Sequence, residues 1–260
     1  MSDFRVFFRP TENETAELKL SAEESHHLVA VNRAGRGAVV IAFDGRGREW
    51  ECELIQDSKS AAILRVRSIR QAQPLPYELT LGQGLPKGPL FDAIVRKATE
   101  LGARRIVPLA SDRSQVHLDG ERQEKKIEKW QHAALEAAKQ CGNPFLPDLT
   151  LIETAKAFIK RAADFDLKLV ASLQPDVGSL QNALKSFRDL HGHAPRRVLW
   201  LIGPEGDFSP EELELAKDHG FLPITLGPLV LRCETAAVYA MSVTNYELQN
   251  VSRGAAWAAE

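Results

Sequence analysis

Residues 198–209 read VLWLIGPEGDFS, and this stretch joins an apolar strand to a glycine-rich turn and the start of a helix. The residues before the turn are all apolar, as in a parallel-sheet strand that is covered on both faces. Ser209 is a good N-cap, Pro210 suits the first helical position, and Glu212 completes a capping box. Strand, turn and helix in this order predict an α/β sheet, whose ligands bind beyond the carboxyl ends of the strands.

The turn itself, GPEG at 203–206, could bring the backbone close to a ligand, because glycine has no side chain. We therefore expect neither Gly203 nor Gly206 to have room for a side chain. The same spacing fits a tight turn without a ligand equally well. A phosphate cradle is disfavoured, because neither GxxxxGK[ST] nor GxGxxG is present and Glu205 and Asp207 would repel phosphate.

A second turn follows one helix later, where residues 226–236 read LGPLVLRCETA. Gly227 and Pro228 are incompatible with regular structure at this point. Three polar side chains then stand between an apolar run and the closing helix: Arg232, Glu234 and Thr235. As an alternative, Glu234 or Thr235 would cap the start of the helix and Arg232 would be an ordinary surface charge. Two such turns on successive strand ends predict a pocket.

The surrounding sequence divides into two parts at the proline-containing stretch 71–76, which can continue neither a strand ladder nor a helix. We predict a β-rich module at 1–72, an α/β domain at 73–250 and a tail at 251–260. In the α/β domain, apolar runs predict five strands of a mainly parallel sheet, at 77–85, 105–109, 167–172, 198–203 and 224–226. The clearest helices besides the one at Ser209 are expected at 90–101, 121–140 and 236–248.

The β-rich module is expected to be a small barrel with strands at 4–8, 38–43, 49–55 and 61–69. One helix should begin at Ser21, with Glu24 completing a capping box. The closing helix of the other domain offers small and apolar residues beyond what one sheet face needs: Ala237, Ala240 and Met241, with Val238 and Tyr239 nearby.

Composition excludes several classes of protein. The chain has 260 residues, of which 44% are hydrophobic, so it can bury a core without disulfides. Its apolar runs of about five residues are too short to span a membrane. Cys52, Cys141 and Cys233 form no CxxC pair, which argues against a zinc site and fits a reducing cytoplasm. His191 and His193 have no third ligand nearby, so no metal site is expected.

Charge is distributed unevenly, although the net charge is only −2. Lys and Arg balance Asp and Glu at 11 against 11 in residues 1–72, whereas the counts are 11 against 9 in 73–140 and 11 against 15 in 141–260. A near-neutral total can therefore hide basic faces. The candidate phosphate contacts are Arg5, Arg9, Arg65, Arg67, Arg70, Lys87 and Arg113. An ordinary solvated face is the alternative for each of them.

Together, GPEG at 203–206, LG at 226–227 and LRCETA at 231–236 resemble the signature of the SPOUT methyltransferases. More narrowly, the chain resembles the RsmE family, which methylates N3 of a uridine in 16S ribosomal RNA. The HHL segment at 26–28 is similar to that family's N-terminal PUA-like barrel, and the resemblance covers residues 4–248.

The resemblance implies a trefoil knot in the SPOUT domain, S-adenosylmethionine (SAM) as methyl donor, and a homodimer that builds the active site from both subunits. It also makes the closing helix, with Ala237, Ala240 and Met241, the dimer interface. It assigns the cofactor to Leu173, Ile202, Gly203, Pro204, Glu205, Gly206, Leu226, Gly227, Leu231, Glu234, Thr235 and Ala236. Arg232 is the candidate catalytic residue, because a permanent positive charge could stabilise the anion formed when N3 loses its proton. An ion pair with Glu234 or with another chain's carboxylate is the alternative role.

The chain departs from the family pattern at three places. Asp207 stands where relatives commonly have a second glycine, and Cys233 stands where threonine or asparagine is more usual. CGNP at 141–144 replaces a stretch that usually carries an arginine. Two further functions remain open: an RNA-binding or ribosome-assembly protein with a degenerate SPOUT domain, and a SPOUT enzyme that acts on another RNA. The expected partner of the enzyme is 16S rRNA, within the 30S subunit.

Overall fold

The computed structural model describes residues 4–10, 16–113, 120–174 and 177–257, with the side chains at 120–121 and 250–257 left undescribed. Two compact units make up the chain. The first unit contains residues 1–74 and 135–146, and the second contains 75–134 and 147–260. The first unit thus includes a segment, 135–146, that the sequence analysis assigned to the α/β domain.

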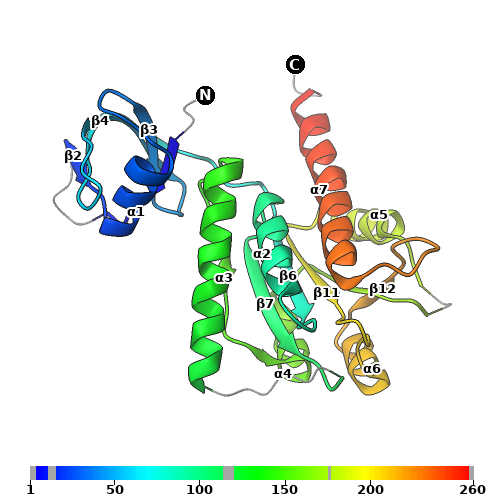
Figure 1. Cartoon of the computed structure of the whole chain (residues 1–260). Coiled ribbons are helices and arrows are strands. Elements are labelled where there is room, and N and C mark those ends of the chain that lie inside the picture. Colours follow the sequence, from blue (N-terminus) through cyan, green and yellow to red (C-terminus); the bar gives the residue numbers. More distant parts are fainter. Residues whose placement is uncertain (1–3, 11–15, 114–119, 175–176, 258–260) are drawn as a thin grey trace. The chain divides into compact units, whose positions relative to one another are not determined.

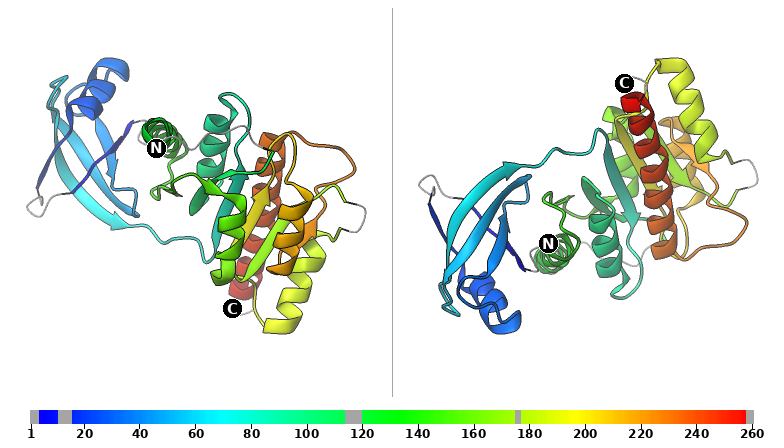
Figure 2. Two further views of the ribbon diagram at one scale, coloured as in Figure 1. Left: turned by 90° about the horizontal axis from the view of Figure 1, so that it is seen from below. Right: turned by 90° about the horizontal axis from the view of Figure 1, so that it is seen from above.

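The first unit is built on a curled, five-stranded half-barrel (Figure 2). Its strands are β1 (Phe4–Phe7), β2 (Glu17–Lys19), β3 (Val39–Phe43), β4 (Arg48–Gln56) and β5 (Ile63–Gln71). The strand order is β1-β3-β4-β5-β2, in which β1 runs parallel to β3 and the other pairs are antiparallel. Strand β2 was not predicted, because a three-residue strand with one buried apolar side chain, Leu18, gives no periodic pattern.

Helix α1 (Ala22–His26) begins where the sequence predicts, since the Ser21 hydroxyl accepts a hydrogen bond from the Glu24 amide at 3.2 Å. The predicted capping box is wrong in its second half. The buried Glu24 carboxylate accepts from the Phe7 amide at 3.1 Å and pairs with the Lys139 ammonium at 2.6 Å. An unpaired carboxylate is costly to bury, so the ion pair with Lys139 is more favourable than the hydrogen bond that would complete the capping box. A π-helical turn, η1 (His27–Val31), continues α1.

The second unit contains a seven-stranded sheet in which every described strand pair is parallel. The strand order is β12-β10-β11-β6-β7-β8, and β9 also pairs with β7. The strands are β6 (Glu78–Gly84), β7 (Arg105–Ala110), β8 (Asp148–Leu149), β9 (Glu153–Thr154), β10 (Leu167–Ala171), β11 (Arg197–Ile202) and β12 (Leu222–Ile224). The mainly parallel α/β sheet predicted from the sequence is confirmed, although β12 overlaps the predicted 224–226 only at Ile224.

Helices cover both faces of this sheet (Figure 1). Helices α2, α3, α5 and α7 pack against one face, and α4 and α6 pack against the other. The helices are α2 (Leu90–Glu100), α3 (Gly120–Cys141), α4 (Ala155–Lys160), the short η2 (Ala162–Asp164), α5 (Leu180–His191), α6 (Pro210–Asp218) and α7 (Cys233–Trp257). Helix α6 begins with the predicted capping box between Ser209 and Glu212.

Helix α7 is longer than the predicted 236–248 at both ends, so residues 251–257 are helical and not a tail. Buried hydrogen bonds fix α7 to the sheet: the Trp200 indole donates to the Thr244 hydroxyl, and the Tyr77 hydroxyl donates to the Asn245 side-chain oxygen, each at 2.9 Å. The middle of α7 is therefore held against β11 and the start of β6. In the described part of the chain, no helix is long and apolar enough to cross a membrane. The trefoil knot stays a prediction.

Candidate active site

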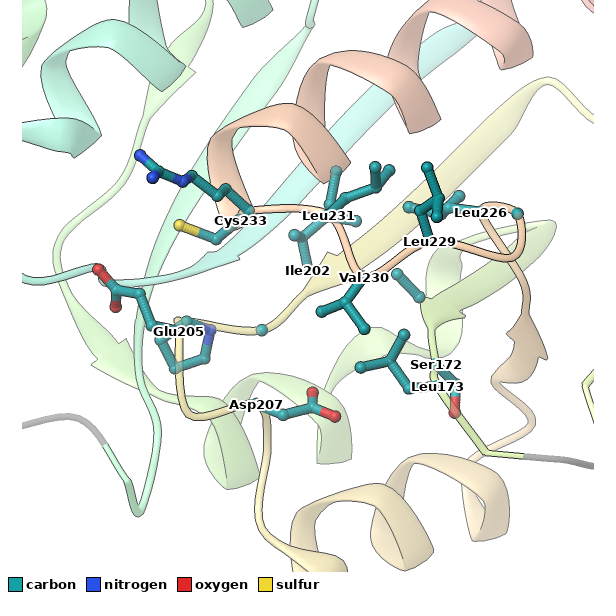
Figure 3. Close-up of a pocket in the computed structure, with 16 residues that line it drawn as sticks. Ser172, Leu173, Ile202, Glu205, Asp207, Leu226, Leu229, Val230, Leu231 and Cys233 are labelled. Atoms are coloured by element: carbon teal, nitrogen blue, oxygen red, sulfur yellow. The ribbon is translucent and has the colours of Figure 1, made fainter.

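A cavity of about 290 Å³ lies at the carboxyl ends of β10, β11 and β12 (Figure 3). These three strands are neighbours in the sheet, so the loops that follow them converge. The carboxyl edge of a parallel sheet is where such folds bind ligands. The volume is close to the lower end of the range for small-molecule sites.

Most of the cofactor residues assigned by the resemblance line this cavity: Leu173, Ile202, Gly203, Pro204, Glu205, Leu226, Gly227, Leu231 and Ala236. Arg232 lines it as well. Three assigned residues do not: Gly206, Glu234 and Thr235. The sequence analysis missed Ala171, Ser172, Asp207, Leu229, Val230 and Cys233. Leu229 and Val230 belong to the second turn and could have been included, whereas the end of β10 carries no motif.

The first turn is tight at one of its two glycines. A Cβ added to Gly203 would lie 2.7 Å from Asp207 Oδ1 and 3.1 Å from Asp207 Cα, so no side chain fits. A Cβ added to Gly206 would meet only the Arg113 side chain, at 3.6 Å, which is ordinary contact. The protein's own atoms therefore leave no room for a side chain at Gly203, whereas at Gly206 they do, and the close approach of the Gly206 backbone to a ligand stays a prediction.

Polar contacts from outside the cavity fix the first turn. The Arg113 guanidinium donates to the Gly206 carbonyl at 2.8 Å. The Lys87 amide donates to the Glu205 carboxylate at 3.1 and 3.2 Å. Lys87 and Arg113, which the sequence analysis proposed as RNA contacts, thus lie at the cofactor turn, with their side chains exposed.

The start of α6 is held by a second polar network. The Ser209 hydroxyl donates to the Asp112 carboxylate at 3.0 Å, and the Asp112 amide donates to the Glu212 carboxylate at 3.0 Å. The Lys156 ammonium lies 2.6 Å from Asp112 and holds the pKa of that carboxyl below its usual value. The chain on both sides of the first turn is therefore anchored.

Three charged side chains line the cavity: Glu205, Asp207 and Arg232. The Arg232 side chain is exposed and has no hydrogen bond or ion pair to any other described residue of the chain. Its proposed ion pair with Glu234 of the same chain is not formed, because the Glu234 carboxylate contacts the Cys233 sulfur at 3.4 Å instead. Arg232 is therefore available to a substrate or to another chain.

The Cys233 thiol lies in the wall of the cavity and is buried. Burial, together with the hydrogen bond to the Glu234 carboxylate, raises the pKa of this thiol to about 12. Since the thiolate is the nucleophilic form, Cys233 is unreactive near neutral pH.

The cavity fits the methyl donor that the resemblance implies. Side chains from all three loops provide an apolar wall for an adenine ring: Leu173, Ile202, Leu226, Leu229, Val230 and Leu231. Glu205 and Asp207 give the cavity negative charge, which suits a cationic ligand such as SAM. Among the described residues, no group of three His, Cys, Asp or Glu side chains could hold a metal ion.

In the first unit, the candidate RNA contacts fall into two groups. Arg5 is only 14% exposed and pairs at 2.8 Å with Glu49, which is 2% exposed. Arg70 also pairs with Glu49, at 2.7 Å, and Arg67 pairs with Glu53 at 3.2 Å. The guanidinium groups of Arg9 and Arg65 are exposed, and no ion pair joins either of them to a described residue. Arg9 and Arg65 are the best placed of these arginines for phosphate.

Comparison with known proteins agrees with this geometry. A family model described as an RNA methyltransferase domain matches residues 73–245, and one described as an RNA methyltransferase PUA domain matches residues 20–67. Ribosomal RNA small subunit methyltransferase E of Bacillus subtilis is 32% identical over 94% of this chain and 97% of its own length. The chain belongs to this family of RNA methyltransferases.

Solved structures of similar proteins agree with the assignment of this chain to the RNA methyltransferase family. The Legionella pneumophila protein Lpg2936, solved in complex with bound SAM, has 31% identity and a TM-score of 0.83, with 95% of this chain and 97% of that chain covered. Ribosomal RNA small subunit methyltransferase E from Neisseria gonorrhoeae, also bound to SAM, has 23% identity, a TM-score of 0.82 and coverage of 93% and 96%. The second similarity concerns the fold alone.

Proposed function

We propose that this RNA methyltransferase transfers a methyl group from SAM to N3 of a uridine in 16S rRNA of the small ribosomal subunit. The proposal rests on one observation. In this member of the family, residues of the GPEG turn and of the LRCETA segment line the same cavity. The Bacillus subtilis relative is named for the small-subunit rRNA, and the similar Legionella protein binds SAM. Ribosomal RNA as substrate places the enzyme in the cytoplasm.

In this proposal, the apolar wall and the first turn hold SAM, which when bound supplies an electrophilic methyl group. N3 of uridine is protonated near neutral pH, and this proton must pass to solvent water for transfer to occur. The resulting negative charge spreads over the flanking carbonyl oxygens of the base. Arg232 stabilises that charge, because its guanidinium lines the cavity and no protein carboxylate of the described chain neutralises it. The base reaches the cavity by leaving its stack in the RNA.

The direct test combines the purified protein, SAM and small subunits from a strain that lacks the enzyme, followed by nuclease digestion and mass spectrometry. We expect one N3-methyluridine per 16S rRNA, with assembled 30S subunits as the better substrate than naked RNA. RNA binding without detectable SAM binding would favour the RNA-binding or ribosome-assembly function. A methyl group on another RNA or another base would favour a different SPOUT activity.

We further propose that the active enzyme is a homodimer with two-fold symmetry. Of the residues predicted for this interface, Ala237, Ala240 and Met241 are buried in the core of a single chain and cannot form it, whereas Tyr239 is exposed. Tyr239 and Tyr246, on the same helix, are 46% and 68% exposed. They are seven residues apart, which places them on one helical face available to a second copy.

Sedimentation of the active enzyme at micromolar concentration should therefore show a dimer. Replacing Tyr246 with glutamate should shift the equilibrium towards the monomer, because a charge is costly to bury in an interface. Leu190→Glu is the matched control, since Leu190 is 80% exposed on helix α5. An active wild-type monomer, or equal dissociation in both variants, would contradict the proposed interface.

The two groups of arginines in the first unit should behave differently. We expect Arg5→Ala to lower the free energy of unfolding by about 1–3 kcal/mol, because buried Glu49 loses one of its two cations. Arg65→Ala should change stability by less than about 0.5 kcal/mol. It should instead lower the slope of log RNA affinity against log salt by about 0.7–0.9. Urea unfolding and salt-dependent RNA binding measure the two effects, and a reversed pattern would assign phosphate contact to Arg5.

A further inference from the structure

Asp207 occupies an unusual position in the cavity wall. Its φ is +59°, a left-handed conformation that side chains other than those of Asn and Asp rarely adopt. One carboxylate oxygen, Oδ1, accepts a hydrogen bond from the Phe208 amide at 2.8 Å, which stabilises this conformation locally. Asp207 also lines the cavity, so its side chain has a surface that a bound ligand can reach.

The other oxygen of Asp207, Oδ2, has no hydrogen-bond partner among the described residues. Arg113 attracts the carboxylate electrostatically, but its guanidinium donates to the Gly206 carbonyl. Asp207 is half-buried, so its carboxylate has less access to water than at the surface, and this burial raises its pKa. A donor supplied by a ligand would relieve this cost.

The position of Asp207 indicates which part of SAM it meets. Figure 3 shows its carboxylate pointing towards Leu173 and lying below Val230, between Glu205 and Cys233 on one side and Leu226 and Leu229 on the other. Cys233 is adjacent to Arg232, where the proposed mechanism places the reacting base. The methyl group must face that end, so the adenosine half of SAM extends away from it, past Asp207 and towards the apolar residues Leu226 and Leu229.

We infer that Asp207 is a SAM-binding residue of this chain, whose Oδ2 accepts a hydrogen bond from an O–H or N–H group of the adenosine half. The inference rests on the proposed function, because it takes SAM as the occupant of the cavity. It assigns a binding role to a position where relatives commonly have glycine. The carboxylate thus adds an acceptor to a turn that otherwise offers the ligand only backbone atoms and Glu205.

Two variants separate this role from a purely conformational one. Asp207→Asn tolerates the left-handed backbone, and its amide oxygen can still accept from Phe208, but its NH2 group replaces the free acceptor. Asp207→Gly also suits the backbone and removes both oxygens. Thermal unfolding of both variants confirms that they fold.

The experiment is calorimetric titration of wild type and both variants with SAM and with 5′-methylthioadenosine, which contains the adenosine half without the amino acid. We expect Asp207→Asn to bind both compounds about tenfold more weakly, and Asp207→Gly to lose at least about threefold for both. Unchanged affinity in both variants would overturn the inference, and so would a loss confined to SAM, which would place the partner of Asp207 on the methionine half. Failure of the wild type to bind SAM would instead refute the proposed function.

Discussion

Replacing Arg232 with alanine should slow methyl transfer by about 10²–10³-fold while SAM still binds with nearly normal affinity. The guanidinium lines the cavity, and no other described residue engages it, so its loss removes charge stabilisation without disturbing a protein contact. SAM is held by the turns and the apolar wall, which the substitution leaves in place. Single-turnover methylation of 30S subunits at saturating SAM measures the rate directly.

The matched control is Arg232→Lys, which keeps a positive charge but has a single ammonium in place of the planar guanidinium. We expect this variant to recover part of the rate, because the positive charge contributes more to stabilising the anion on the uridine base than the planar shape of the guanidinium does. Arg232→Ala should also leave the salt dependence of RNA binding nearly unchanged. If it lost RNA affinity and kept a normal transfer rate, Arg232 would be a phosphate contact.

Much of the second unit follows from local sequence signals. The apolar run before GPEG and the capping box of Ser209 and Glu212 correctly predicted β11 and the start of α6, because both signals are local. The segment between α3 and β10 was not predicted. Its strands, β8 and β9, contain two residues each, and their stability comes from pairing with β7. Pairing of that kind leaves no periodic pattern in the sequence.

The site was predictable where a motif marked it and not elsewhere. Both turns carry glycine next to proline, and the cavity formed between them. Ala171 and Ser172 line the same cavity because β10 lies between β11 and β12, which is a fact of strand order and not of sequence spacing. The burial of Met241 was also not predictable from the sequence, because helical periodicity does not indicate which face of a helix packs against the sheet.

Electrostatic pairing explains the remaining differences. Glu24 has the spacing of a capping-box residue, but Lys139, far away in the sequence, gives its buried carboxylate a stronger partner. Arg5 likewise has the charge of a phosphate contact, but Glu49 already neutralises it. In both cases a long-range ion pair decides the role of the side chain, and a single sequence does not reveal such a pair.

The substitution Gly203→Ala should reduce SAM affinity by up to about 100-fold. Its Cβ would lie 2.7 Å from Asp207 Oδ1, 3.1 Å from Asp207 Cα and 3.3 Å from the Phe208 nitrogen. Two of these atoms belong to the backbone, so the turn itself must move, and overpacking of this kind costs about 1–3 kcal/mol. Movement of the turn displaces Pro204 and Glu205 from the cavity wall.

Gly206→Ala is the matched control for this loss. It adds the same methyl group to the other glycine of the same turn, where there is space for it. Its Cβ would meet only Arg113 side-chain atoms, at 3.6 and 3.9 Å, and Gly206 does not line the cavity. We expect this variant to bind SAM within about threefold of wild type, a difference below about 1 kcal/mol. Calorimetry with SAM measures both affinities, and urea unfolding verifies that both variants fold. Near-normal affinity in Gly203→Ala, or an equal loss in Gly206→Ala, would mean that the first turn does not hold the methyl donor through its tight glycine.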